Sequence, residues 1–130
     1  MNEIIVQSKS RTGFIDVTPD VQQFADGNGM KDGLITVFVP HTTAGVTINE
    51  NADPDVTADM ETVLDRMVPW DGGYRHSEGN TAAHVKASLM GSSVQVIVKN
   101  SKLCLGTWQS IYFCEFDGPR TRKIWLKESV

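Results

Sequence analysis

Apolar and polar positions alternate along much of the chain in a way that predicts short strands. The β-branched runs at 4–8 and 13–17 are separated by a polar tetrapeptide, which predicts two strands joined as a hairpin. The run at 34–39 is almost continuously apolar, which predicts a central strand covered on both faces. Further strands are predicted at 46–48, 94–98, 110–116 and 121–126.

Apolar residues at three- and four-residue steps predict two helices in the first half of the chain. The first helix should begin at Thr18, which is followed by proline, and end at Gly27. The second should begin after Asp53, a favoured N-cap residue that is also followed by proline. Its apolar residues are expected to face the core: Val56, Met60, Val63, Leu64 and Met67.

A third helix is predicted at 80–90, after a turn-rich loop at 69–80. Val85 and Leu89 should face inward. Strands and helices are grouped unevenly, which predicts an α+β fold, a mainly antiparallel β-sandwich-like core with two to three helices, in a single domain at 1–130. A polar row on another side of the third helix consists of Asn80, His84 and Ser88.

Composition is that of an ordinary globular protein, and it excludes several classes of function. Of the 130 residues, 40% are hydrophobic and 22% are charged, and the net charge is -4 without any basic run, which argues against nucleic acid as a partner. No apolar stretch approaches the length of about 20 residues that a membrane span needs, so we expect a cytoplasmic protein. Cys104 and Cys114 lie in apolar surroundings, which predicts buried free thiols.

Three histidines are the leading candidates for a functional site. We expect His41 at a break between two strands, His76 in the turn-rich loop and His84 on the polar side of the third helix. If the fold brings them together, they could supply three nitrogen ligands to a divalent metal, or acid and base groups that work near neutral pH. Each one taken alone is more simply a surface or hydrogen-bonded imidazole.

A polar cluster at 49–55 offers carboxylates. Glu50 and Asp53 are candidate ligands for Mg²⁺, which prefers carboxylate oxygens and phosphates. The simpler interpretation is that the cluster turns the chain and that Asp53 caps the second helix.

The segment at 105–109, Leu-Gly-Thr-Trp-Gln, is a candidate anion site. Gly106 and Thr107 could present a backbone N–H and a hydroxyl to phosphate. The alternative is a β-bulge with Trp108 packed in the core. No nucleophile elbow, nucleotide phosphate-binding loop or dinucleotide fingerprint occurs in the chain.

Two arginines at alternate positions form a second candidate anion site. Arg120 and Arg122 should lie on the same face of a strand, where two guanidinium groups could clamp a phosphate or a carboxylate. The alternative is cross-strand pairing with Glu115 or another acid.

Five motifs occur in order along nearly the whole chain: His-Thr-Thr-Ala at 41–44, Asn-Glu-Asn-Ala-Asp at 49–53, Gly-Asn at 79–80 with Ala-His at 83–84, Leu-Gly-Thr-Trp-Gln at 105–109, and Phe-Asp-Gly-Pro-Arg at 116–120. Together they closely resemble the YjbQ-like family, proteins assigned as secondary thiamine-phosphate synthases. One departure is Asn100-Ser101, where members often carry a glycine, but asparagine also tolerates a left-handed turn.

The resemblance implies a compact α+β domain with a small β-sandwich, assembled as a homotrimer with sites near the subunit boundaries. It also implies a transferase that joins a hydroxymethylpyrimidine pyrophosphate to a thiazole phosphate and releases pyrophosphate. The expected partner is a small phosphorylated substrate, with a divalent metal (Mg²⁺ or Zn²⁺) as a possible cofactor and no organic cofactor.

The site expected on this basis has three parts. Catalytic roles fall to His41, His84 and Glu50. Substrate and phosphate binding falls to Thr42, Thr43, Asn49, Asn80, Gly106, Thr107, Gln109, Arg120 and Arg122. The metal ligands would be His41, His76, His84 and Asp53.

Two other functions remain open at this point. One is a metal-dependent hydrolase of a small phosphate or ester that uses the histidines to activate water. The other is a non-catalytic module in which the same polar pocket binds a metabolite.

Overall fold

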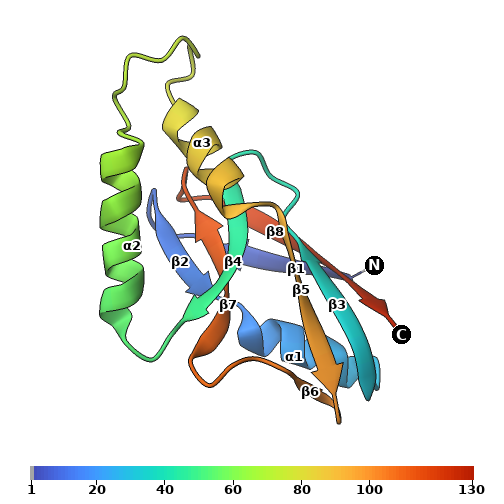
Figure 1. Ribbon diagram of the computed structural model, residues 1–130. Coiled ribbons are helices and arrows are strands. Elements are labelled where there is room, and N and C mark those ends of the chain that lie inside the picture. The colour runs from blue at the N-terminus through green and yellow to red at the C-terminus, as the bar shows by residue number, and fades with distance from the viewer. Residues whose placement is uncertain (1) are drawn as a thin grey trace.

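The computed structural model describes residues 2–130, in which eight strands and three helices are defined (Figure 1). All strand pairs are antiparallel, so the predicted α+β class with a mainly antiparallel core is confirmed. The strands are β1 (Asn2–Gln7), β2 (Gly13–Asp16), β3 (Asp32–Phe38), β4 (Ala44–Glu50), β5 (Ser93–Lys99), β6 (Lys102–Leu103), β7 (Gln109–Glu115) and β8 (Thr121–Ser129). The helices are α1 (Thr18–Gly27), α2 (Pro54–Met67) and α3 (Thr81–Met90).

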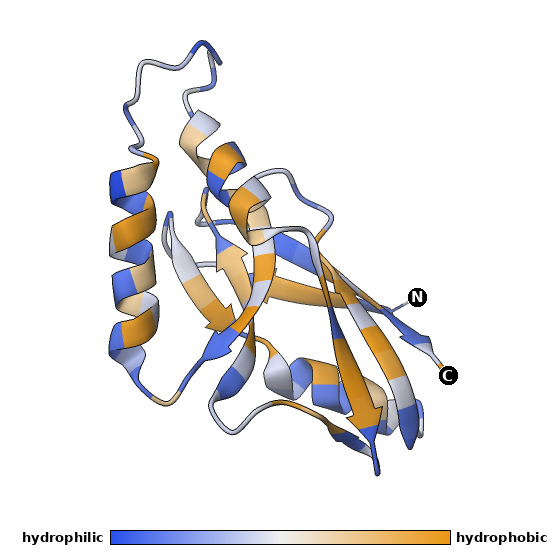
Figure 2. Cartoon of the chain, viewed as in Figure 1, coloured by the Kyte–Doolittle hydropathy of each residue, from blue (hydrophilic) through white to orange (hydrophobic). Residues whose placement is uncertain are grey.

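Two sheets enclose the main hydrophobic core. The larger sheet has the strand order β1-β8-β3-β5-β6 and the smaller one the order β2-β7-β4. Helix α1 covers the lower end of the core in Figure 1 and contributes the buried residues Val21, Phe24 and Ala25. Apolar positions recur along the strands that line this core (Figure 2). The strand at 34–39 is central, between β8 and β5, as predicted.

Strand β7 is buried on both faces and separates two hydrophobic clusters. Ile111 and Phe113 belong to the main core, whereas Tyr112 and Cys114 pack with Leu64 of α2 and with α3. This follows from the alternation of side chains along a strand. The smaller sheet therefore lies between the larger sheet and a layer made of α2 and α3, which a long loop connects (Figure 1).

The predicted N-terminal hairpin is wrong. Strand β1 pairs with β8 in the larger sheet, and β2 pairs with β7 in the smaller one. The tetrapeptide between them therefore carries the chain from one sheet to the other. The loop between β7 and β8 makes the same crossing, and the two crossings are joined by hydrogen bonds from the N–H of Ser8 to the carbonyl of Arg120 and from the N–H of Gly118 to the carbonyl of Arg11.

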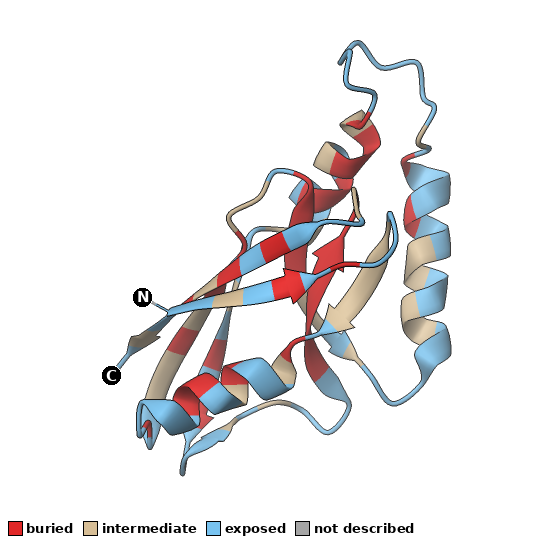
Figure 3. Ribbon diagram, turned by 180° about the vertical axis from the view of Figure 1, so that it is seen from behind, coloured by how far each residue is buried: buried red, intermediate tan, exposed pale blue. Residues whose placement is uncertain are grey.

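Helix α2 begins where the sequence predicts, but it buries less than expected. Among its apolar residues only Leu64 is buried, while Val63 is 47% and Met67 65% exposed. Figure 3 shows most of this helix as exposed or intermediate. No helix within residues 2–130 is long and apolar enough to cross a membrane.

Helix α3 presents the opposite face from the one predicted. Val85 and Leu89 are 39% and 53% exposed, and the buried residues are Ala82, Ala83, Lys86 and Ala87. The cause is the close approach of α3 to β4. A Cβ at Gly45 would lie only 2.7 Å from the carbonyl oxygen of Gly91, so small side chains have to form the contact face.

Two further expectations need correction. The strand at 34–39 is covered mainly on the face that carries Ile35 and Val37, while Phe38 is exposed. Both cysteines are free, but Cys104 is exposed. Cys114 is buried, and burial raises the pKa of its thiol to about 12.

Asp53 caps α2, because its Oδ1 accepts the N–H of Asp55 at 2.9 Å. Replacing Asp53 with alanine should therefore lower the free energy of unfolding by about 0.5–2 kcal/mol, the usual cost of losing an N-cap. Urea denaturation measures this. The matched control is Asp59→Ala on the exposed face of the same helix, expected within about 0.5 kcal/mol of the parent. Equal costs for the two variants would contradict the cap.

Candidate functional site

His41 and His84 line one cavity, although they are far apart in sequence. His41 lies in the segment between β3 and β4, and His84 lies in the middle of α3. The cavity has a volume of about 470 Å³. It is completed by Thr42, Ala44, Ala87, Ser88, Gly91 and Ser92.

The backbone after α3 brings these elements together. The carbonyl of Gly91 accepts the N–H of Val46 at 3.1 Å, and the carbonyl of Ser92 accepts the N–H of Val39 at 2.7 Å. The chain leaving α3 is thus tied to both sides of the segment that carries His41. His84 and Ser88, one helical turn apart, share the face that lines the cavity, as the four-residue spacing predicts.

His41 is held as a neutral imidazole. Its Nε2 accepts the backbone N–H of Lys123 at 2.9 Å, which requires that nitrogen to be unprotonated. Burial of the ring lowers the pKa of His41, and the nearby charge of Arg122 lowers it further, while Glu115 opposes them. The proton of the neutral ring therefore sits on Nδ1, which is left as a hydrogen-bond donor.

Arg122 lines a second cavity beside the first, and hydrogen bonds to Glu115 and Thr43 hold its guanidinium in place. Its Nε donates to Glu115 Oε1 at 2.8 Å, and its Nη2 donates to Glu115 Oε2 and, at 2.9 Å, to Thr43 Oγ1. Burial raises the pKa of Glu115, but hydrogen bonds from Arg122 and from the N–H of Asp117 outweigh it, and the net pKa is lowered. The predicted alternative for Arg122, pairing with Glu115, is thus what the structure shows.

One edge of the Arg122 guanidinium remains for a ligand. Its Nη1 has no hydrogen-bond partner within residues 2–130 and is not among their fully buried unpartnered atoms, and Arg122 is one of the residues that line this cavity. The second cavity has a volume of about 460 Å³ and shares three residues with the first: His41, Thr42 and Ser92. We call the two adjoining cavities the histidine groove.

Arg120 also lines the groove, but from an exposed position. Its guanidinium donates to the backbone carbonyl of Asp117 at 2.8 Å and to the Asp117 carboxylate at 3.0 Å. The two arginines therefore do not form a matched clamp, because Arg122 is buried and Arg120 is about half exposed.

Asn80 does not line the groove, but it binds Asp117, the partner of the groove residue Arg120. Its side chain is buried, and its Nδ2 donates to Glu78 Oε2 at 2.9 Å and to Asp117 Oδ2 at 2.8 Å. These bonds tie the start of α3 to the Asp117–Arg120 pair. The Asn80 Oδ1 atom is buried without a partner among residues 2–130.

His76 lies beside His84, not in the groove. Their ring centroids are 5.5 Å apart in an edge-to-face arrangement, and His76 Nε2 is 3.8 Å from Glu78 Oε1. Residues 2–130 contain no group of three or more His, Cys, Asp or Glu side chains placed to hold a metal ion. The expected ligand set of His41, His76, His84 and Asp53 is therefore not assembled.

The remaining sequence candidates gather at the opposite end of the smaller sheet. Strand β4 runs from Ala44 to Glu50, about 20 Å at about 3.3 Å per residue. The antiparallel register pairs Glu50 with Gln109 there. The residues at this end are Asn49, Glu50, Asp53, Gly106, Thr107 and Gln109.

The turn at this far end is closed on itself. The N–H of Gly106 donates to Gln109 Oε1 at 2.8 Å, so it is not free for phosphate. Trp108 is 60% exposed, so the alternative in which it packs in the core is wrong as well. Ser92 is a groove residue that the sequence-based prediction missed; its only signal is its place directly after the glycine that ends α3.

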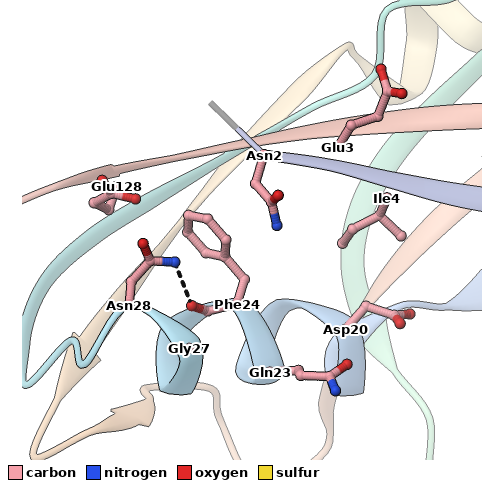
Figure 4. Close-up of a pocket in the computed structure, with 9 residues that line it drawn as sticks. All are labelled: Asn2, Glu3, Ile4, Asp20, Gln23, Phe24, Gly27, Asn28 and Glu128. Atoms are coloured by element: carbon pink, nitrogen blue, oxygen red, sulfur yellow. Dashed lines mark hydrogen bonds between the residues drawn. The ribbon is translucent and has the colours of Figure 1, made fainter.

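A larger cavity lies away from the histidines, between α1 and the edge of the larger sheet (Figure 4). Its volume is about 550 Å³, and Phe24 lies at its base. Among residues 2–130, its polar lining consists of three carboxylates and three amides, without a histidine, arginine or lysine. It therefore lacks the imidazoles and the cationic side chains that distinguish the histidine groove.

Solved structures of similar proteins share this fold over nearly the whole chain. A protein of Clostridium acetobutylicum, described as an uncharacterized conserved protein of the YjbQ/UPF0047 family, has a TM-score of 0.97 and 55% identity, covering 99% of this chain and 100% of that chain. A conserved hypothetical protein of Thermus thermophilus has a TM-score of 0.92 and 36% identity, covering 99% and 100%.

Curated relatives are similar over most of their length as well. UPF0047 protein YugU of Bacillus subtilis is 53% identical over 123 residues, which are 94% of this chain and 93% of that protein. UPF0047 protein YjbQ of Escherichia coli O157:H7 is 39% identical over 116 residues, which are 86% and 83% of the two chains.

The functions expected from the sequence are wrong on these findings. The relatives carry family names or are described as uncharacterized, so the similarity brings no thiamine-phosphate synthase activity with it. Metal-dependent hydrolysis is also wrong, because residues 2–130 hold no group of side chains suited to the expected metal site. The relatives give no support to the third alternative either, a non-catalytic metabolite-binding module.

The family itself is shown by three agreeing comparisons. The sequence model of the family described as UPF0047 protein YjbQ-like matches residues 2–129. The curated relatives carry the same family name, and the solved structures have the same fold. The resemblance carried by the five sequence motifs is therefore confirmed, and the chain belongs to the YjbQ-like UPF0047 family.

Proposed function

We propose that the chain is an enzyme that moves a proton on a small phosphorylated substrate bound in the histidine groove. The observation that carries this proposal is the state of His41: a neutral imidazole, oriented by the N–H of Lys123, in a cavity that also contains His84. A fixed hydrogen-bond donor and a second titratable group therefore line the same cavity, which is what proton-transfer chemistry requires.

His41 would act through its Nδ1–H. A neutral imidazole whose pKa is lowered can donate a hydrogen bond to a carbonyl oxygen and polarise it, which makes a neighbouring C–H more acidic. His84 lines the same cavity and is the candidate for the group that takes up and returns the proton. Both steps leave the histidines in their starting state after a turnover.

The phosphorylated part of the substrate would bind at the Arg122 side of the groove. The guanidinium is held rigidly by Glu115 and Thr43, so little side-chain entropy is lost when its Nη1 donates to a phosphate oxygen. Arg120, at the rim of the same cavity, adds a second guanidinium. Glu115 cancels part of the positive charge, which favours moderate rather than tight binding.

Solvent exchange tests the reaction class without knowledge of the natural product. Phosphorylated aldehydes and ketones with a C–H beside the carbonyl are incubated with the protein in D₂O, and proton NMR follows the loss of that C–H signal. We expect catalysed exchange with at least one of them, weakened in Arg122→Lys. Exchange no faster than in buffer across the panel would contradict proton transfer.

Two further properties stay predictions. The homotrimer implied by the resemblance would give a mass in solution of three times 14.3 kDa. A cytoplasmic setting is supported by the two cysteines, which are both free.

A further inference from the structure

We propose that a second site, on the other side of α3, binds a phosphate group through Lys86 and Arg11. The site is a cavity of about 550 Å³ between the end of α2, the loop after it, α3 and the segment that connects β1 to β2. Its lining residues are Arg11, Thr12, Asp65, Pro69, Trp70, Asp71 and Lys86. We call it the lysine cavity.

The first observation is a buried ammonium group with unused donors. Only 3% of the Lys86 side chain is exposed, although buried lysines are rare unless they are paired. An ammonium carries three N–H donors, and within residues 2–130 only Asp65 accepts one of them. Buried donors are normally satisfied, so the remaining two call for acceptors inside the cavity that Lys86 lines.

The second observation is an arginine placed at the same cavity without an acidic partner. The Arg11 guanidinium lies over the ring of Trp70, with its Cζ atom 4.2 Å from the ring centroid. It takes part in none of the ion pairs of residues 2–130. This cation–π contact holds the guanidinium at the cavity, and its N–H groups have no acidic partner there, so they can bind an oxyanion in a forked arrangement.

These two cations favour phosphate over a singly charged ligand. Asp65 and Asp71 also line the cavity, so its formal charge is balanced and the affinity should be modest. Asp65 is 57% exposed, so water screens its charge more than that of the buried Lys86. A dianion that bridges Lys86 and Arg11 gains two charge-assisted contacts, whereas a carboxylate gains fewer.

The lysine cavity is separate from the histidine groove. Lys86 and His84 are two residues apart on α3, which at 3.6 residues per turn puts them on nearly opposite sides of the helix. None of residues 2–130 lines both sites. Binding at one site can therefore be measured while the other is disabled.

The experiment is an NMR titration with inorganic phosphate at constant ionic strength, following the indole N–H signal of Trp70, which Trp70→Phe identifies. We expect a saturable shift in the parent protein. Lys86→Met, which keeps the chain length, and Arg11→Gln should each raise the dissociation constant at least about tenfold, the effect of losing one charged hydrogen bond. Lys102→Met, an exposed lysine on β6, is the matched control and should leave it unchanged.

Two results would overturn the proposal. One is a Trp70 signal that phosphate does not move, or moves equally in Lys86→Met and Lys102→Met. The other is tighter binding of acetate than of phosphate, which would contradict the assignment to a phosphate group. His41→Ala should leave this titration unchanged, so failure of the histidine groove proposal does not affect it. Arg11→Gln changes an exposed side chain and remains informative even if Lys86→Met fails to fold.

Discussion

Replacing Arg122 with methionine should lower the free energy of unfolding by about 3–5 kcal/mol, the usual cost of breaking a buried ion pair by removing one partner. Arg122 and Glu115 have only 3% and 1% of their side chains exposed. The substitution leaves the Glu115 carboxylate in the interior without its charged partner, although the backbone N–H groups of Phe116 and Asp117 still donate to it. Urea denaturation at pH 7 measures the loss.

A second variant separates the buried charge from the lost packing. The double variant Glu115→Gln with Arg122→Met removes both charges, so it should be less destabilised than Arg122→Met alone. Arg120→Met is the control, because its partner Asp117 is nearer the surface and the pair should be worth about 1 kcal/mol or less. Equal losses for Arg122→Met and Arg120→Met would contradict a role for burial.

The same pair sets a dependence of stability on pH. The pKa of Glu115 is lowered in the folded protein, so the unfolded chain binds its proton more readily. The pair therefore contributes its full stability above the ordinary pKa of a glutamate, and that contribution is lost as the pH falls through the lowered value. Arg122→Met should weaken this dependence, because the main partner of the carboxylate is gone.

The positions of the helices follow from local signals in the sequence, whereas the pairing of strands does not. Asp53 followed by proline marks the start of α2, and Gly27 marks the end of α1, because caps and stops act within one turn. The N-terminal strands β1 and β2 pair with β8 and β7 at the other end of the chain. That pairing depends on how the two sheets pack against each other, and no local spacing in the sequence indicates it.

The inward face of α3 shows a second limit of pattern reading. Valine and leucine at 85 and 89 predict the buried face, but the helix packs closely on β4, and three of its four buried residues are alanines. Lys86 is buried on the same face because Asp65 and the lysine cavity accept its charge. A hydrophobic pattern predicts burial from the free energy of transferring each side chain to an apolar medium. It therefore does not predict the burial of a lysine whose ammonium group faces a polar cavity.

The candidate site was predictable where its residues share a helix or a strand end. His84 and Ser88 are one turn apart, and His41 lies at a break between strands, so their exposure could be read from the sequence. The polar cluster around Glu50 follows His41 closely in sequence, yet a whole strand separates them in space. Glu115 forms a buried ion pair with Arg122, and the sequence suggested this pairing only as an alternative.

Replacing His41 with alanine should lower the rate of solvent exchange on a responsive phosphorylated carbonyl compound by about 10²- to 10⁴-fold, the range typical of a lost acid–base group. His41→Gln should retain more activity, because its amide still offers an N–H donor. His76→Ala is the matched control, since His76 lines neither cavity of the histidine groove. Thermal unfolding should show that all three variants remain folded.

The dependence on pH gives the second readout. Burial and the charge of Arg122 lower the pKa of His41, so the neutral imidazole predominates at pH 7 and is lost only as the pH falls below the ordinary histidine value of 6.5. The exchange rate should therefore fall on the acid side of that value, and the midpoint of the fall should match the pKa of His41 measured by NMR. A His41→Ala variant as active as His76→Ala, or a rate that rises as His41 becomes protonated, would contradict the neutral imidazole as the donor, because the protonated ring cannot accept the N–H of Lys123 that orients it.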